Sequence, residues 1–98
     1  MSYSVKFPTV GIEKKFQKEL GSIPSQKIQN DIMEAVEKLA DNPRPIGEPK
    51  IKPPMILYSF TAQYRIRIGP YRVLYDVDDK GKTIWIMAVR KRDEKTYK

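Results

Sequence analysis

Apolar residues recur at helical spacing twice in the first 42 residues of the chain. Residues 3–7 first alternate between apolar and polar, which predicts a short half-buried strand. Over residues 9–21 an apolar side chain then stands at every fourth position, so we expect a short amphipathic helix that stops at Gly21. A second apolar stripe predicts a longer helix with Pro24 in its first turn, which ends at Asn42-Pro43.

From Met55 onward the apolar period changes from about four to two. Residues 43–54 hold five of the eight prolines and are expected to form a constrained loop. The alternation after them predicts four strands, with a turn at "DDKGK" before the last one. These strands are "MILYSFTA", "YRIRI", "YRVLYDV" and "TIWIMAV".

The order of these elements predicts an α+β fold. We expect the N-terminal strand and the helix pair to pack on one face of an antiparallel sheet of about four to five strands, with the other face open or lightly covered. The last three strands follow one another through short turns, which is typical of a meander. No repeat or linker interrupts the chain, so residues 1–98 are expected to form a single domain.

The segment "YRIRIGPYRVLY" places like charges close together. Gly69-Pro70 suits a two-residue type II′ turn, because glycine supplies the positive φ of its first central position. That turn puts Arg67 opposite Arg72, with Arg65 on the same face of the sheet. The apolar side chains would then share the face toward the helices: Ile66, Ile68, Tyr71, Val73 and Tyr75.

Opposed arginines have two explanations. Directly opposite like charges destabilise a sheet by a few tenths to about 1 kcal/mol. In the first explanation Asp76, Asp78 or a glutamate lies between them as a counter-charge. In the second the guanidinium groups converge on the place of an external anion, since their planar forks match phosphate.

Charge is concentrated in the last third of the chain. The net charge is +7, and residues 64–98 hold ten lysines and arginines against five acidic residues. Such a surface suits a polyanion such as nucleic acid, although it would also serve solubility or an acidic partner. The closing run Arg90-Lys91-Arg92 ends the last strand, and antiparallel pairing would bring it near Arg72.

The missing residue types narrow the chemistry. There is no cysteine, which excludes disulfides and thiolate nucleophiles, and no histidine, which removes the commonest general base and metal ligand. No acidic cluster has the spacing of metal ligands, so no metal or other cofactor is implied. No apolar run approaches about 20 residues and no signal-peptide core opens the chain, so we expect a cytoplasmic protein without a membrane partner.

The chain resembles the RelE/ParE superfamily of bacterial and archaeal toxin–antitoxin toxins over nearly its whole length. "EAVEKLADNPRP" resembles the family's second helix and its exit, and "YRIRIGPYRVLYDVDD" resembles its most recognisable pair of strands. "AVRKRDEKTYK" is similar to the closing segment, in which a basic pair is followed by a tyrosine. This chain has Arg90-Lys91-Arg92 where many members have Gly-His-Arg, so a histidine role is absent or passes to Lys91.

The resemblance implies one of two activities on the same fold. RelE-like members enter the ribosomal decoding site and cut mRNA by attack of a 2′-hydroxyl on the adjacent phosphate, whereas ParE-like members poison DNA gyrase. Both are held inactive by a cognate antitoxin that covers the basic surface, which implies a toxin–antitoxin hetero-oligomer. A third reading is a non-catalytic module that binds RNA or an antitoxin.

Carried over to this chain, the RelE-like pattern implies a catalytic set of Arg67, Arg72, Arg92 and Tyr97. Arginine does not give up its proton, but it can hold the charge that develops on a phosphorane. Tyr97 is the candidate base, because surrounding cations favour tyrosinate, or it stacks on an RNA base. Lys91, Lys95 and Arg92 remain alternatives as proton donor to the leaving group. The remaining candidate RNA contacts are Arg65, Lys50, Lys52, Arg90, Lys91 and Lys95.

Overall fold

The computed structural model describes residues 2–45 and 50–91, except for the side chains at positions 50, 52 and 53. Two helices, α1 (Val10–Gly21) and α2 (Gln26–Lys38), accompany five strands in one sheet. In chain order the strands are β1 (Ser4–Lys6), β2 (Lys50–Leu57), β3 (Phe60–Ile68), β4 (Tyr71–Asp78) and β5 (Thr83–Lys91). In the described part of the chain, no helix has the length and apolar character needed to cross a membrane.

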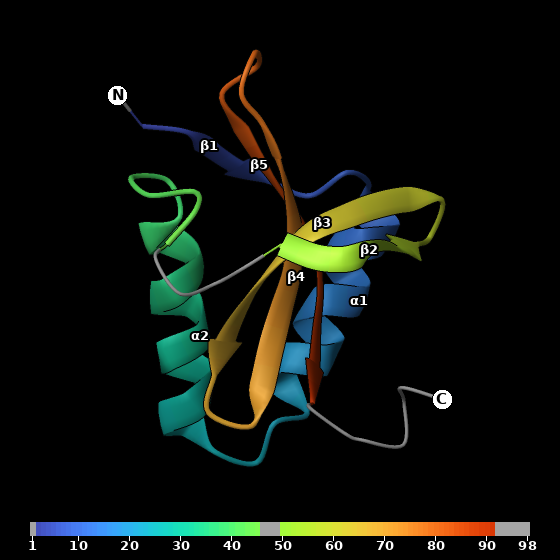
Figure 1. The fold of residues 1–98 in the computed structure, drawn as a ribbon. Coiled ribbons are helices and arrows are strands. Elements are labelled where there is room, and N and C mark those ends of the chain that lie inside the picture. The colour runs from blue at the N-terminus through green and yellow to red at the C-terminus, as the bar shows by residue number, and fades with distance from the viewer. Residues whose placement is uncertain (1, 46–49, 92–98) are drawn as a thin grey trace.

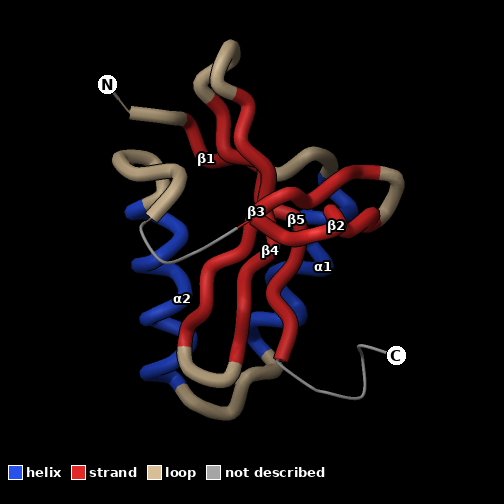
Figure 2. The backbone as a smooth tube through the Cα atoms, in the orientation of Figure 1, coloured by secondary structure: helices blue, strands red, loops and turns tan. Residues whose placement is uncertain are grey.

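The sheet is mixed, with the order β1-β5-β4-β3-β2. The four later strands run antiparallel to their neighbours and form the predicted meander. The N-terminal strand joins the sheet itself, because β1 pairs in parallel with β5 from Ser4 opposite Thr83 to Lys6 opposite Trp85. Figures 1 and 2 show α1 behind the sheet and α2 at its left side beside β3, with β2 crossing in front.

Both helices begin where a hydroxyl caps them. The Thr9 hydroxyl accepts a hydrogen bond from the Ile12 backbone at 3.0 Å, and the Ser25 hydroxyl accepts one from Ile28 at 3.2 Å. These bonds satisfy backbone N–H groups that have no partner inside the helix. The prediction that Pro24 lies in the first turn of α2 is therefore wrong, because this proline precedes the capping residue.

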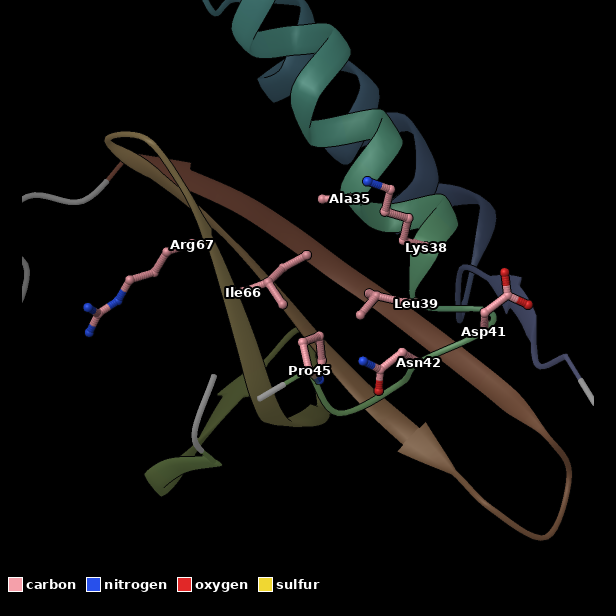
Figure 3. A pocket seen from close by; sticks show the side chains of 8 residues that line it. All are labelled: Ala35, Lys38, Leu39, Asp41, Asn42, Pro45, Ile66 and Arg67. Carbon is pink, nitrogen blue, oxygen red and sulfur yellow. The ribbon is translucent and has the colours of Figure 1, made fainter. Parts of the chain in front are cut away.

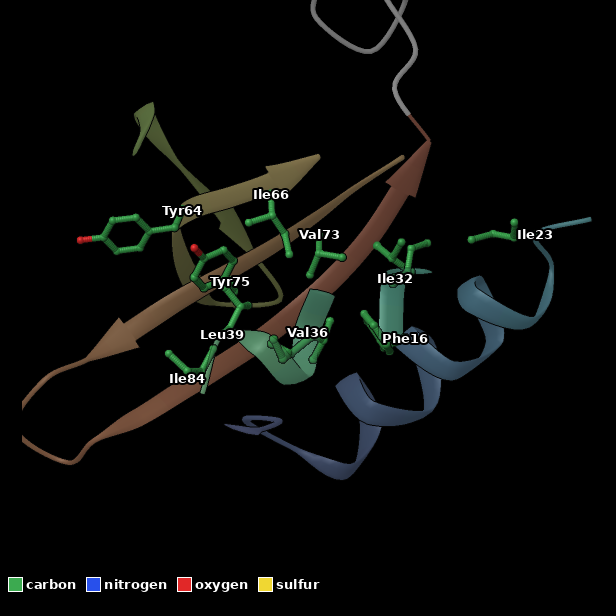
Figure 4. Packing of buried hydrophobic residues seen from close by; sticks show 12 residues of the cluster. Phe16, Ile23, Ile32, Val36, Leu39, Tyr64, Ile66, Val73, Tyr75 and Ile84 are labelled. Atoms are coloured by element: carbon green, nitrogen blue, oxygen red, sulfur yellow. The ribbon is translucent and has the colours of Figure 1, made fainter. Parts of the chain in front are cut away.

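The main core fills the space between the helices and the sheet (Figure 4). Phe16 comes from α1, Ile32 and Val36 come from α2, and these side chains pack against the strands. On the sheet side the buried side chains are those of Tyr64, Ile66, Val73, Tyr75, Ile84, Ile86 and Val89. The apolar face predicted for the β3–β4 hairpin is thus confirmed as the face toward the helices.

A second, smaller core lies on the opposite face of the sheet. Side chains of the β2–β3 hairpin pack there against β4 and β5 in one cluster: Ile51, Leu57, Ala62, Leu74, Met87 and Ala88. A shift of register between Leu74 and Tyr75 lets consecutive residues of β5 join this cluster. The hairpin therefore covers the middle of the face that also carries the arginines.

Two boundaries in the middle of the chain differ from the prediction. The segment "MILYSFTA" is not one strand, because Tyr58 and Ser59 turn the chain with φ angles of 52° and 73° between β2 and β3. The preceding strand also begins at Lys50, inside the predicted loop 43–54. Prolines are tolerated in β2 because it is an edge strand whose register is irregular between Lys50 and Met55.

Candidate anion-binding site

The β3–β4 hairpin has the register that its sequence predicts. Gly69 adopts a φ of 57°, and Ile68 lies opposite Tyr71, so that Arg67 lies directly opposite Arg72. Arg65 lies opposite Leu74, on the same face as this pair. The turn residues therefore fix the two arginines against each other, at the Cα separation of about 4.5–5.5 Å that opposite residues have.

A third arginine extends the row. Arg90 of β5 lies directly opposite Arg72 of β4, so Arg67, Arg72 and Arg90 stand side by side on three adjacent strands. Cross-strand partners project from the same face of a sheet, so the three side chains share one face. We call these three residues the arginine row. The sequence predicts the run Arg90-Lys91-Arg92 near Arg72, and this is confirmed for Arg90, which the sequence pattern places among the RNA contacts and not in the catalytic set.

The middle residue of the row is the most buried of the three. Arg67 is exposed, Arg90 is half-buried, and Arg72 between them is only 8 % exposed. Burying a charge is costly, and a like charge on each side adds repulsion to that cost. A folded chain accepts such a cost most readily where the charges serve a binding site.

Arg90 has two polar partners within the protein. Its Nη2 donates a hydrogen bond to the Tyr58 hydroxyl at 3.2 Å, and its Nε lies 3.7 Å from Oε2 of Glu19 on α1. A glutamate therefore does supply counter-charge at this end of the row, as one of the two explanations from the sequence requires. The Lys15 ammonium lies 5.4 Å from the centre of the Tyr58 ring and adds a further cation beside the row.

The other candidate basic residues lie in several places. Lys91 lies opposite Tyr71, and this places it on the helix-side face, away from Arg90. Lys50 and Lys52 belong to β2, where the backbone of Lys50 pairs with that of Tyr64, but their side chains lie outside the described residues. Arg92, Lys95 and Tyr97 also lie outside the described residues.

Asp78 and Asp79, at the end of β4, make hydrogen bonds that the sequence does not predict in full. Asp78 accepts a hydrogen bond from the Gly81 backbone at 3.0 Å and fits the expected turn role. Asp79 instead binds both Nη atoms of Arg44, at 3.2 and 2.8 Å, and accepts a bond from the Tyr3 hydroxyl at 2.7 Å. The Arg44 hydrogen bonds, helped by that from Tyr3, lower the pKa of the Asp79 carboxyl.

Asp76 lies on the same face as the arginine row, opposite Trp85. Burial raises the pKa of its carboxyl, and hydrogen bonds from the Val77 backbone and the Gln63 side chain offset this only in part. One of its oxygens, Oδ1, is buried and has no hydrogen-bond partner among the described residues. Its distance from Arg72 along β4 is four residues, or about 13 Å, so it is no counter-charge for the row.

A cavity of about 450 Å³ opens between α2 and β3 (Figure 3). Its floor is apolar, with Leu39, Pro45 and Ile66, and Lys38 and Asp41 contribute charge at its edge. Arg67 also lines it, but its side chain points away from Ile66. The cavity therefore lies on the helix side of β3, behind the face that carries the arginine row.

The arrangement of the arginine row suits one kind of chemistry. Guanidinium groups hold a phosphate through paired hydrogen bonds and keep their charge at any pH that the fold survives. A row of three can stabilise negative charge on a bound anion, but arginine cannot act as a base. Proton transfer would need another residue, and Tyr58 is the tyrosine that the described residues place against the row.

Two helices on a mixed five-stranded sheet, with arginines aligned on the opposite face, define a class of small basic α+β proteins. The model of the ParE toxins of type II toxin–antitoxin systems, known as parDE, matches residues 10–96. The chain therefore belongs to the ParE toxin family, within the RelE/ParE superfamily that its sequence motifs indicate. No curated protein matches it in sequence.

Solved structures of toxin–antitoxin proteins share the fold. A chain of the archaeal RelE–RelB complex from Pyrococcus horikoshii is 29% identical, with a TM-score of 0.69 over 96% of this chain and 99% of that one. A chain of the RelBE2 complex from Mycobacterium tuberculosis is 26% identical, with a TM-score of 0.64 over 94% and 100%. A free mutant of E. coli RelE, at 18% identity and a TM-score of 0.63 over 99% and 92%, shows the fold alone.

Proposed function

We propose that this toxin is a RelE-like endoribonuclease that cuts mRNA in the ribosomal A site. The observation that carries the proposal is the arginine row, in which Arg67, Arg72 and Arg90 lie opposite one another on three strands. A phosphate group of RNA is the anion that such a row suits best. The similarity to chains of the solved RelBE2 and RelE–RelB complexes, at 26% and 29% identity, supports the same choice.

In the proposed reaction the 2′-hydroxyl attacks the adjacent phosphorus. The hydroxyl loses its proton, a bond forms between the 2′-oxygen and phosphorus, and the bond to the 5′-oxygen breaks as that oxygen takes up a proton. The arginine row, Arg67, Arg72 and Arg90, together with Arg92 holds the charge added to the phosphorane. Such preorganised donors contribute most in a site of low dielectric. Tyr97 is the proposed base, and Lys95 or Arg92 gives the leaving group its proton, since Lys91 lies on the other face of the sheet.

The proposal includes a protein partner. The similar structures from P. horikoshii and M. tuberculosis are toxin–antitoxin complexes, so we propose a cognate antitoxin that binds this chain as well. A net charge of +7 favours an acidic partner as much as it favours RNA. Acting on translating ribosomes, the toxin would work in the cytoplasm.

The test is cleavage of mRNA on purified translating ribosomes. We expect the wild-type toxin to cut, and Arg72→Lys to cut about 10²-fold more slowly, because lysine keeps the charge but loses the fork. Lys14→Ala removes one positive charge from the exposed side of α1 and should cut like the wild type. The proposal fails if folded wild-type toxin leaves the mRNA whole, or if Arg72→Lys cuts as fast as the wild type.

A second candidate follows from the family model, which is that of ParE toxins. In this alternative the arginine row binds without cutting, and the target is DNA gyrase. Supercoiling of plasmid DNA by purified gyrase, with and without the toxin, separates the two. If the toxin inhibits supercoiling and leaves mRNA intact, this second candidate replaces the first. If the toxin does neither, it is a module that only binds RNA or an antitoxin.

A further inference from the structure

Arg90 is held from two elements that lie far apart in the sequence. Glu19 reaches it from the last turn of α1, and Tyr58 reaches it from the turn between β2 and β3. The direction of the Arg90 side chain therefore depends on contacts from outside its own strand pair.

Glu19 and Arg90 are close enough for charge attraction but do not form a hydrogen bond. Their atoms Oε2 and Nε are 3.7 Å apart, which is too long for a hydrogen bond but short enough for charge attraction. Glu19 Oε1 and Arg90 Nε are also buried without a hydrogen-bond partner among the described residues. Buried polar atoms without partners are costly, so this pair is poorly explained as a stabilising ion pair.

The turn that carries Tyr58 has a strained backbone. Tyr58 and Ser59 both adopt left-handed φ angles, 52° and 73°, where a two-residue hairpin turn normally has Asn-Gly. A bulky residue in this region is an outlier, and such strain is found mostly at functional sites. The tyrosine is also 37 % exposed, so burial of its ring does not account for its presence.

From these two observations we propose that Glu19 and Tyr58 are positioning residues for Arg90, and that they aim its guanidinium at the phosphate of the RNA. The inference rests on the proposed function. Tyr58 fixes the guanidinium through its hydroxyl, while Glu19 holds it by charge and lowers the repulsion within the arginine row. Glu19 also places a negative charge beside the site, so it weakens RNA binding while it favours the reaction.

Because Glu19 both weakens RNA binding and aims Arg90, its substitution should lower KM and kcat together. Glu19→Gln removes the negative charge, so KM should fall by about two- to fivefold, the factor of an exposed ion pair. The guanidinium is then less well aimed, so kcat should fall about tenfold or more, as it does when a reacting group is misplaced. Tyr58→Phe keeps the ring but not the hydroxyl, and should lower kcat while KM stays the same.

Cleavage kinetics on ribosome-bound mRNA test this, with Glu34→Gln as the control. That variant makes the same charge change on an exposed position of α2 and should leave both constants unchanged. In an Arg90→Lys background, Glu19→Gln should no longer lower kcat, because its effect passes through Arg90. The inference is overturned if Glu19→Gln leaves kcat unchanged, or lowers it equally with and without Arg90.

A spectroscopic measurement separates this inference from the proposed function. If the wild-type toxin leaves mRNA whole, the proposed function fails, but the Nε–H signal of Arg90 in an NMR spectrum still reports how its side chain is held. We expect a resolved signal in the wild type and in Glu34→Gln that moves or broadens in Glu19→Gln and in Tyr58→Phe. A signal that is the same in all four proteins would overturn the positioning role.

Discussion

Arg72 and Asp76 are charged residues that the fold places in unfavourable surroundings on the same strand. Arg72 is 8 % exposed and has an arginine on each side, and Asp76 has a buried oxygen without a partner among the described residues. The cost of Arg72 has an explanation in the proposed site, whereas nothing in the site uses Asp76. Natural proteins keep such destabilising residues where function needs them, so the two should respond differently to substitution.

We expect Asp76→Asn to raise the free energy of unfolding at pH 7. The carboxyl has a raised pKa in the folded protein, so its ionised form is disfavoured there relative to the unfolded chain. This penalty is present at neutral pH and disappears as the pH falls through the folded and then the unfolded pKa. The gain should therefore be largest at pH 7 and small below about pH 4.

Urea unfolding of Asp76→Asn and wild type at several pH values measures this. Glu34→Gln, an exposed acidic residue, serves as control and should change stability by less than about 0.5 kcal/mol. A loss of stability in Asp76→Asn at pH 7 would contradict the account and would show that the charge of Asp76 is needed.

Asp79 should show the opposite dependence on pH. It links three segments, since it binds Arg44 after α2 and Tyr3 before β1 and itself follows β4. Its pKa is lowered, so its ionised form favours the folded state above the ordinary carboxyl pKa, and this contribution is lost as the pH falls through the lower folded value. Asp79→Asn should therefore lower the Tm at pH 7 and have little effect near pH 2. An equal loss at both pH values would mean that its charge is not what matters.

At the scale of the elements, the Gly69-Pro70 turn sets the register on which the arginine row depends. Gly69 has a φ of 57°, and a Cβ there would meet nothing within 4 Å, so only the backbone resists substitution. Gly69→Ala should destabilise by about 1–2 kcal/mol in urea unfolding. Gly21→Ala at the end of α1, which also has free space, should cause no loss. Equal effects of the two would show that the turn conformation is not required.

The same turn shows how much of the fold and site could be predicted from the sequence. Gly69-Pro70 is a strong local signal, and it gave the pairing of Arg67 with Arg72 correctly. Tyr58 and Ser59 carry no such signal, because neither is a residue type that favours a positive φ, and so the sequence does not predict the turn between β2 and β3.

The third arginine shows a limit of another kind. The pairing of Arg90 with Arg72 depends on the irregular register between β4 and β5, which a period-two pattern does not reveal. The shift is reflected in β5 by two consecutive residues, Met87 and Ala88, that are buried on the same face. The contacts of Glu19 with Arg90 span 71 residues of sequence, and no local pattern predicts them.

At the scale of the molecule, the two faces of the sheet have different roles. The face toward the helices carries the larger cluster of buried apolar residues (Figure 4), whose burial is the main source of stability. The other face has only a small core beneath the β2–β3 hairpin, and this leaves room for the arginine row at one end. The chain can thus keep its fold while the charged face remains available for an anionic partner.

The central claim is that the arginine row serves to cut mRNA, and mapping mRNA 5′ ends in cells tests it most directly. The toxin is induced without an antitoxin, as the wild type, as Arg72→Lys and as the charge control Lys14→Ala. The account predicts growth arrest with new 5′ ends inside coding regions for the wild type and Lys14→Ala, and neither effect for a folded Arg72→Lys. Growth arrest by the wild type without new mRNA ends would contradict it.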